Sequence, residues 1–519
     1  MRRNLISLLV VFLGCFVALR AEAQDQIRDL VVKIHATQQA PNLLSPWRHR
    51  SPQQVKGSGV VIDGKRILTN AHVVRYAKQI YVQPNQSASH IPARIVALSP
   101  GMDLAVLKLD NESFFDNRGT LPFAQELPRV KDNVNVYGYP TGGTELSVTQ
   151  GIVSRIEYTD YYYQSAGLRI QVDAALNFGN SGGPAVTNGR LVGLVFSLIQ
   201  NAQNIGYLIP VEEIQLFLND IADGAYDGKP QTHDLIQTIE NPALRKKLGL
   251  PNGINGIMIA QPYRDDPSYP LKEWDVITQI GDTPIDSDGK VRIRYDLRLS
   301  ASYLVQKYSK NGVLPVKVFR GGKLLALDVP ASTARDLVIP YLLNDQPRYF
   351  IFGPLVFSQT TQDYIERLGN RLSPMLGREP SPLFTRRFDK PAFDNEELVI
   401  VASPLFPHRI TQGYDDPNRA VLSAVNDVPV KNLRHLVEIL RDSRDEQISF
   451  KFATAGKLFH ETMVFNRSEL IEATAQILEE NGIRYPISAD LRAVWESATP
   501  IEKKSARFGC CESARANRP

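Results

Sequence analysis

Cysteine is scarce in this 519-residue chain. Of its three cysteines, one lies in an N-terminal apolar run, and two are adjacent in a polar C-terminal tail: Cys15, Cys510 and Cys511. Such a set cannot form a disulfide framework, so the domains must be stabilised by hydrophobic cores. Adjacent cysteines rarely bond to each other without strain. The tail pair is therefore either an intermolecular link or chemically inert.

Signatures of bound cofactors are also missing. The sequence has neither a Walker-type phosphate loop nor a His-Glu-x-x-His zinc motif. We therefore expect chemistry carried by side chains, with no ATP, metal or other cofactor. The net charge is only +4 and the basic residues are dispersed, which argues against nucleic acid as a partner.

Long hydrophobic runs are absent except at the N-terminus. Arg2 and Arg3 precede the apolar run Leu5–Leu19, and Ala21-Glu22-Ala23 fits a cleavage site. The run is shorter than the roughly 20 residues that span a bilayer. We predict a signal peptide over residues 1–23 and an exported chain with no stable membrane span. An uncleaved anchor, or a lipid-modified Cys15, is the alternative.

Short strand-like runs separated by turn signals fill residues 24–222. Asp63-Gly64 and Asn188-Gly189 each separate two apolar runs, which is typical of β-hairpins. Many short strands in one region favour β-barrels. The polar, proline-containing stretch 38–54 predicts a surface loop, and Pro210 predicts the start of a closing helix.

A glycine-rich hexapeptide carries the strongest chemical signal: Gly179-Asn180-Ser181-Gly182-Gly183-Pro184. A serine hydroxyl is a poor nucleophile unless a base takes its proton and N–H groups stabilise the oxyanion. Glycines allow the backbone to curl so that N–H groups converge. Taken alone, the stretch could equally be a glycine-rich hairpin.

Two upstream residues decide between these interpretations. His72 follows the strand-like run 66–69, and Asp103 opens another apolar run. In isolation each residue could have a purely structural role: His72 as a half-buried histidine, and Asp103 as a turn or cap residue. Together with Ser181 they give the order His–Asp–Ser with long gaps, which is the arrangement of two-barrel serine proteases.

The blocks around these residues resemble those of HtrA/Deg serine proteases. They are Asn70-Ala71-His72-Val73-Val74, Asp103-Leu104-Ala105-Val106 and the stretch 173–184, and the likeness runs from about Val55 to Trp495, closest to the plant-type Deg branch. The resemblance implies a mainly β chain: a chymotrypsin-like double β-barrel followed by two PDZ-like α+β domains. Phe178 departs from the proline or arginine that many members carry.

The resemblance also implies roles for individual residues. His72 would be the general base, Asp103 its orienting partner and Ser181 the nucleophile, with an oxyanion hole from the N–H groups of Gly179 and Ser181. The specificity pocket would be lined by Ala175 and Leu176, which predicts small or medium apolar side chains before the cleaved bond. The stretch Val195-Phe196-Ser197 would pair with substrate as an extra strand.

Beyond the protease domain (24–222), we predict a PDZ domain over 226–335 and a divergent PDZ-like domain over 345–470, then a helix and disordered tail over 471–519. Leu271–Ile285 resembles a PDZ core block, and Leu235 and Ile236 mark the tentative peptide-binding loop. The family's glycine is missing there, and Asp234 would repel a terminal carboxylate. Internal peptide binding or a purely structural role is therefore at least as well supported as C-terminal capture.

As a whole, the sequence predicts an ATP-independent serine endopeptidase that acts on unfolded or damaged proteins in extracytoplasmic quality control. A peptide-binding scaffold or holdase chaperone with a dormant triad is the alternative. The resemblance implies a homo-oligomer, a trimer or hexamer. The predicted compartment is a bacterial periplasm, with a plant or other eukaryotic lumen left open.

Overall fold

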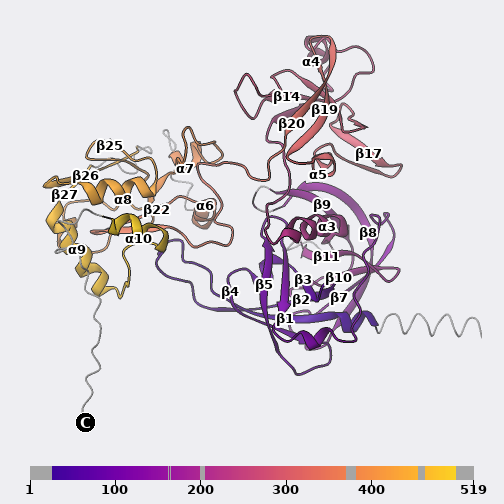
Figure 1. Cartoon of the computed structure of the whole chain (residues 1–519), viewed down its shortest axis with the longest axis horizontal. Coiled ribbons are helices and arrows are strands. Elements are labelled where there is room, and N and C mark those ends of the chain that lie inside the picture. Colours follow the sequence, from indigo (N-terminus) through magenta and orange to yellow (C-terminus); the bar gives the residue numbers. More distant parts are fainter. Residues whose placement is uncertain are drawn as a thin grey trace, which may run out of the picture. The chain divides into compact units, whose positions relative to one another are not determined.

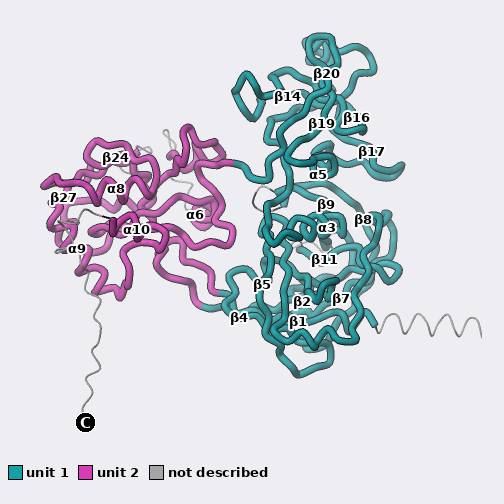
Figure 2. Tube along the Cα trace, in the orientation of Figure 1, with its two compact units in different colours: residues 1–38, 52–335 teal, residues 39–51, 336–519 magenta. Residues whose placement is uncertain are grey.

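The computed structural model describes residues 26–161, 163, 165–198, 205–369, 381–453 and 462–497. The predicted signal peptide and both tail cysteines lie outside these residues. The chain forms two compact units (Figure 2): residues 1–38 with 52–335, and residues 39–51 with 336–519. Each is described here by itself.

A closed six-stranded barrel opens the first unit (Figure 1). Its strands follow the order β1-β2-β3-β6-β5-β4. The predicted hairpin at Asp63-Gly64 is confirmed, because Ile62 pairs with Arg66 across it, and Gly64 (φ +80°) and Lys65 (φ 54°) supply the positive φ angles that tight hairpins need. The bounds are β1 Val31–Gln38, β2 Gln53–Ile62, β3 Arg66–Thr69, β4 Ala77–Pro84, β5 Ile91–Ser99 and β6 Leu104–Leu109, with the short helices α2 Ala71–Val74 and η1 Glu112–Phe115.

A second closed barrel follows, in the order β10-β11-β12-β9-β8-β7. Its hairpin at Asn188-Gly189 was also predicted, and both turn residues have positive φ. Pro210 is the N-cap of the helix α3, one residue before the position predicted for it. The bounds are β7 Asn133–Gly138, β8 Ser147–Asp160, β9 Ala166–Val172, β10 Pro184–Thr187, β11 Arg190–Leu198, β12 Gly206–Pro210, α3 Val211–Asp220 and η2 Ile221–Asp223.

The middle domain, predicted over residues 226–335, lies in the part of the first unit that follows the barrels. Its sheet has the order β13-β14-β15-β19-β20, with β16 on β15, and β17 and β18 form a separate pair. Most of its buried apolar residues share one cluster with the core of the second barrel, and a separate small cluster contains Ile239, Met258, Val276 and Phe319. The bounds are β13 Leu235–Thr238, α4 Pro242–Lys247, β14 Ile257–Gln261, β15 Val276–Ile280, β16 Thr283–Pro284, β17 Lys290–Arg294, β18 Leu297–Ser300, α5 Tyr303–Tyr308, β19 Val313–Arg320 and β20 Lys323–Pro330.

The terminal domain (residues 336–497) has two sheets, β21-β22-β23 and β25-β24-β26-β27. The apolar run 349–357, expected to be one buried strand, is instead a hairpin that turns at Gly353 (φ 57°). The domain continues past the expected end at residue 470, because Leu478, Ile487 and Leu491 are buried in its cores. The bounds are β21 Tyr349–Phe352, β22 Leu355–Gln359, α6 Gln362–Leu368, α7 Pro382–Thr385, β23 Val399–Val401, η4 Arg409–Thr411, β24 Leu422–Val425, β25 Val428–Pro429, α8 Leu433–Asp442, β26 Gln447–Phe452, β27 Met463–Asn466, α9 Arg467–Glu480 and α10 Ala489–Glu496.

The connection between β1 and β2 differs from its predicted form. Residues 39–51 group with the terminal domain rather than with the barrel from which they arise. Pro41 and Pro46 are buried, and Leu43, Leu44 and Trp47 pack against buried apolar residues of that domain. This stretch is therefore a folded, docked segment and not a surface loop.

Candidate active site

His72 lies on α2, a single helical turn directly after β3. The buried Asn70 side chain precedes the helix and donates its Nδ2–H to the backbone carbonyl of Asp103 at 2.9 Å. This bond ties the start of the helix to the loop before β6. Two predicted site residues, 31 positions apart, are thereby fixed next to each other.

The Asp103 carboxylate contacts His72 twice. One oxygen accepts the His72 backbone N–H at 2.8 Å, and the other lies 2.6 Å from the ring Nδ1. Asp103 is buried and adopts a left-handed φ of 55°, whereas 46% of the His72 side chain is exposed. Because Nδ1 is held by the carboxylate, the ring presents Nε2 to the open side.

The environment of His72 acts on its pKa in two opposing ways. Burial lowers the pKa of the imidazole, since desolvation penalises the charged form. The negative charge of Asp103 and its hydrogen bond act in the opposite direction and outweigh burial, so the pKa of His72 is raised above the usual 6.5. A histidine with a raised pKa is a stronger base, which suits proton transfer from a hydroxyl.

The Ser181 loop is held against the first barrel by Ser58 on β2. The Ser58 hydroxyl donates to the Gly179 carbonyl at 2.8 Å, and its backbone N–H donates to the Ser181 carbonyl at 2.8 Å. Gly182 (φ +83°) must be glycine, because a Cβ there would lie 2.2 Å from the Ser58 carbonyl oxygen. Ser58 itself is fully buried.

The N–H groups of Gly179 and Ser181 are the predicted oxyanion donors. The Phe178 carbonyl accepts a hydrogen bond from the Thr141 N–H at 2.6 Å. Because C=O and N–H point in opposite directions in a trans peptide, the Gly179 N–H points away from Thr141. Among the described residues, neither the Gly179 nor the Ser181 N–H has a backbone acceptor.

The two halves of the site meet at Gly57. A Cβ built on Gly57 would lie 2.6 Å from the Val73 side chain and 3.3 Å from the Ser181 carbonyl oxygen. The His72 helix and the Ser181 loop thus flank one glycine. Within the described residues, the Ser181 hydroxyl makes no hydrogen bond to His72, a separation common in unliganded catalytic sites.

The predicted substrate-contacting residues separate into two groups. Ala175 is exposed and Leu176 is half-buried, beside the loop that carries Ser181. Val195 and Phe196 are buried, and the Val195 N–H and C=O already bond to Gly183 and Gly182. Val195 therefore stiffens the Ser181 loop and cannot pair with a substrate strand as predicted.

Pairing with substrate at the rest of that stretch stays a prediction. The β11–β12 register skips Phe196 between Val195 and Ser197, so the ladder is irregular there. The Phe196 ring lies beside Tyr161, with ring centroids 5.4 Å apart, and under the Arg169 guanidinium. Phe178, on the opposite side of Ser181 in the sequence, is 63% exposed.

In the middle domain, β13 is an edge strand whose four residues are all exposed. Leu235 is 59% and Ile236 is 48% exposed, which are high values for apolar side chains. The Asp234 carboxylate accepts the Tyr263 N–H at 2.8 Å and the Tyr269 hydroxyl at 3.1 Å. The predicted peptide-binding residues thus stand on an open sheet edge, preceded by an anchored negative charge.

Sequence inspection missed three residues of this site: Ser58, Asn70 and Gln38. The Gln38 amide donates to the His72 and Val73 carbonyls at 2.7 and 2.9 Å. Asn70 stood inside a recognised block and could have been found there. Ser58 and Gln38 act across the fold on backbone carbonyls, and nothing local in the sequence marks them.

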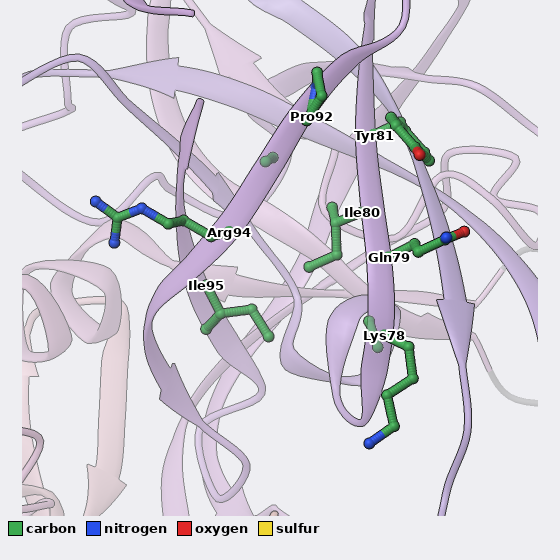
Figure 3. Close-up of a pocket in the computed structure, with 9 residues that line it drawn as sticks. Lys78, Gln79, Ile80, Tyr81, Pro92, Arg94 and Ile95 are labelled. Carbon is green, nitrogen blue, oxygen red and sulfur yellow. The ribbon is translucent and has the colours of Figure 1, made fainter. Parts of the chain in front are cut away.

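A hollow elsewhere on the first barrel does not belong to this site. It lies between β4 and β5, and its lining includes Lys78, Ile80, Tyr81, Arg94 and Ile95 (Figure 3). None of its lining residues is His, Ser, Cys, Asp or Glu, and none belongs to the predicted triad.

The described residues hold no cluster of three or more His, Cys, Asp or Glu side chains placed to bind a metal ion. None of their helices has the length and apolar character required to cross a bilayer.

Comparison with known sequence families agrees with this geometry. The trypsin-like peptidase domain family matches residues 57–194, and the PDZ domain family matches residues 338–490. The first match contains His72, Asp103 and Ser181. Fold and family together define a trypsin-like serine endopeptidase.

Whole-length relatives narrow this class to one family. The chain is 32% identical over 469 residues to "Protease Do-like 2, chloroplastic" of Arabidopsis thaliana, covering 89% of this chain and 75% of the relative. It is 33% identical over 472 residues to "Protease Do-like 4, mitochondrial" of the same plant, covering 90% and 86%. The chain belongs to the Deg/HtrA family of serine proteases.

A solved structure of an HtrA-type protease, AlgW with a tripeptide, is 27% identical. It covers 61% of this chain and 97% of its own, with a TM-score of 0.48.

Proposed function

We propose that the chain hydrolyses peptide bonds of unfolded or damaged proteins through His72, Asp103 and Ser181. The observation that carries the proposal is the double contact of Asp103 with His72, which leaves Nε2 available as a base. Ser181 Oγ attacks the scissile carbonyl and His72 takes its proton. His72 then returns that proton to the leaving amine, while Asp103 holds the tautomer and stabilises the imidazolium.

The N–H groups of Gly179 and Ser181 stabilise the oxyanion in this mechanism. The Thr141–Phe178 hydrogen bond supports this assignment, because it turns the Gly179 N–H away from Thr141. Loss of one such donor costs roughly 3–4 kcal/mol in model enzymes. Ala175 and Leu176 select small or medium apolar side chains. No step needs ATP or a metal ion.

Cleavage of casein by the mature chain tests the proposal. Ser181→Ala is expected to lower kcat on the order of a millionfold, as loss of a nucleophile does in model enzymes. Equal cleavage by the variant and wild type, or no cleavage by either under any condition, would overturn the protease assignment.

The pH profile tests the role of His72. Protonated His72 cannot act as a base, so kcat/KM falls as pH drops through its pKa. Because Asp103 raises that pKa, the acid limb should have its midpoint above 6.5. Asp103→Asn should move the midpoint lower and reduce kcat by roughly 10⁴-fold. A flat profile in wild type would contradict a histidine base.

The second candidate is a peptide-binding scaffold or holdase chaperone with a dormant triad. What favours it is that the Ser181 hydroxyl makes no hydrogen bond to His72 among the described residues. Suppression of aggregation of an unfolded protein, measured with wild type and Ser181→Ala, separates the two. Full chaperone activity without any cleavage in wild type would favour the scaffold.

The setting of this activity is extracytoplasmic quality control by a homo-oligomer, a trimer or hexamer. The predicted leader at residues 1–23 supports export. The named relatives are chloroplastic and mitochondrial, so they lend no support to a periplasmic location. Light scattering of the mature protein measures the assembly, and fractionation of the source cells measures the compartment.

A further inference from the structure

The segment between β1 and β2, residues 39–51, is a closed and folded loop that we call the tether. Its ends are joined, because the Arg50 N–H donates to the Ala40 carbonyl at 2.8 Å. Inside it, the Asn42 N–H donates to Arg48 at 3.0 Å, and the Asn42 side chain accepts the Leu44 N–H at 3.1 Å. Such internal bonding is typical of compact loops with a defined shape.

The tether packs on one face of the terminal domain, within the same compact unit (Figure 2). The Ser403 hydroxyl donates to the Leu44 carbonyl. The Trp47 and Phe406 rings lie 5.6 Å apart. The Arg48 guanidinium donates to the Asn481 carbonyl at 3.3 Å, at the end of α9. Aromatic packing and backbone-directed hydrogen bonds together make this a specific docked contact.

The residue just before the tether reaches the candidate active site. Gln38 ends β1 and pairs with Gln53, the first residue of β2. Its amide donates to the carbonyls of His72 and Val73 at 2.7 and 2.9 Å. Because α2 is only four residues long, these carbonyls have no partner inside the helix. Gln38 therefore supplies a cap to the turn that carries His72.

We propose that the tether is a conformational device through which the terminal domain holds the His72 helix in place. Docking at Leu44, Trp47 and Arg48 holds the tether, which begins one residue beyond Gln38, so the Gln38 side chain stays ordered against α2. The net stabilisation by two hydrogen bonds is comparable to the rotamer entropy of a glutamine side chain. Anchoring on the tether side, added to the strand pairing of Gln38 with Gln53 and Ala77, therefore favours the conformation in which Gln38 bonds to His72 and Val73.

This inference rests on the proposed role of His72, but its first test does not need activity. Hydrogen exchange by mass spectrometry on the full mature chain reports residues 39–51 and 71–76 separately. At the C-terminal end of α2 the readout is the Arg75 N–H, bonded to the Ala71 carbonyl at 2.7 Å. Phe406→Ala should speed exchange roughly tenfold in both segments. Phe393→Ala, an exposed aromatic truncation of the same domain, should change neither.

The result that overturns the coupling is faster exchange in 39–51 with 71–76 unchanged in Phe406→Ala. Unchanged exchange in 39–51 overturns the docking face itself. Gln38→Met should speed exchange in 71–76 alone, because it removes the cap and leaves the tether docked. Should Phe406→Ala unfold the domain, as exchange in β26 would reveal, Ser403→Ala repeats the test by removing only the bond to Leu44.

The tether docks on the terminal domain of its own chain. In a background with Cys510 and Cys511 replaced by serine, Leu44→Cys with Ser403→Cys should be joined by a short bismaleimide within one chain. Covalent dimers as the main product would overturn the same-chain assignment and indicate exchange between copies.

The last test of the coupling between the tether and His72 measures proteolytic activity. Phe406→Ala and Gln38→Met should each lower kcat roughly three- to tenfold with KM unchanged, since both loosen the His72 turn. The double variant should be no slower than Gln38→Met, because both act through one residue. Independent, multiplying losses would overturn the coupling. If wild type cleaves nothing, the proposed function fails, while the exchange experiment still decides the tether.

Discussion

The middle and terminal domains are built on the same plan but differ at one edge. In the middle domain, β13, β14, β15 and β19 lie side by side, with β16 on β15 and α5 before β19. In the terminal domain, the equivalent elements are β22, β23, β24 and β26, with β25 on β24 and α8 before β26. A bridge between Ile400 and Val421 joins its two sheets into the same order.

The difference lies beside the first strand of each set. In the described residues β13 pairs only with β14, and its four residues are exposed. The corresponding β22 is buried, because β21 pairs along its other side. The outer edge of β21 is closed in turn, with the Ile351 N–H donating to the Pro486 carbonyl at 2.6 Å.

The difference at this edge indicates that the two domains have different functions, although their strands follow the same order. PDZ domains bind an extended peptide by adding it to a sheet edge. The middle domain leaves that edge open, whereas the terminal domain fills it with a strand of its own. The comparison therefore predicts peptide recognition by the middle domain and a structural role for the terminal domain, which also holds the tether.

The largest expected effect comes from truncating the strand that fills the edge. Phe350 on β21 is fully buried, with ring centroids 5.8 Å from Phe352 and 5.1 Å from Trp495. Phe350→Ala should destabilise the terminal domain by about 3–5 kcal/mol. Leu235→Ala on the open β13 should change stability by less than about 0.5 kcal/mol. Calorimetry of the full chain measures both, and equal shifts would break the comparison.

A second contrast concerns buried charge. Glu213 on α3 is fully buried and accepts hydrogen bonds from Lys229 at 2.7 Å, the Leu168 N–H at 2.9 Å and the Gln306 amide of α5 at 2.9 Å. It therefore joins the second barrel to the middle domain. Glu213→Gln leaves the Lys229 charge buried without its partner, which should cost about 3 kcal/mol.

Its control is the same substitution in the terminal domain. Glu438 forms an i,i+4 pair with Arg434 at 3.0 Å, and the arginine is well exposed. Glu438→Gln should cost less than about 0.5 kcal/mol. Thermal unfolding followed by calorimetry compares them. A Glu213→Gln shift no larger than the control would show that the buried pair does not join the middle domain to the barrel.

The sequence predicted those parts of the molecule whose backbone conformation is determined by a few adjacent residues. Turns such as Asn188-Gly189 and the blocks around His72 and Ser181 are readable because a few adjacent residues fix the backbone there. The hairpin at Gly353-Pro354 carried the same kind of signal but was masked by the apolar residues on both sides. A glycine followed by proline inside an apolar run indicates a turn.

Contacts between segments far apart in the sequence could not be predicted from it. The Ser58 hydroxyl reaches a carbonyl 121 residues away, and Ser403 reaches one 359 residues away. Both acceptors are backbone atoms, which every residue possesses, so no side-chain pattern marks them. The polar composition of residues 38–54 indicated a surface loop, while Leu43, Leu44 and Trp47 contact their partners only in the folded chain.

The open edge can be tested by peptide binding. A fluorescent apolar peptide should bind the Ser181→Ala chain, and Ile236→Asp should weaken binding about tenfold by placing a charge on an apolar contact. Val428→Asp is the matched control, because Val428 is similarly exposed (43%) in the terminal domain. Anisotropy titrations measure both. Equal losses of affinity in Ile236→Asp and Val428→Asp would contradict binding at the β13 edge.

The smallest expected effect distinguishes internal peptides from chain ends. Asp234 precedes β13, and its carboxylate accepts the Tyr263 N–H and the Tyr269 hydroxyl. Burial, and then the charge of Asp234, raise the pKa of Tyr269, so this hydroxyl keeps its proton and remains a donor. The anchored negative charge should disfavour a second carboxylate. An amidated peptide should therefore bind as well as its free acid, or up to about threefold more tightly at low ionic strength. Asp234→Asn should strengthen binding of the free acid and leave the amide unchanged, whereas a free acid that binds tenfold more tightly to the native chain would establish capture of C-terminal ends.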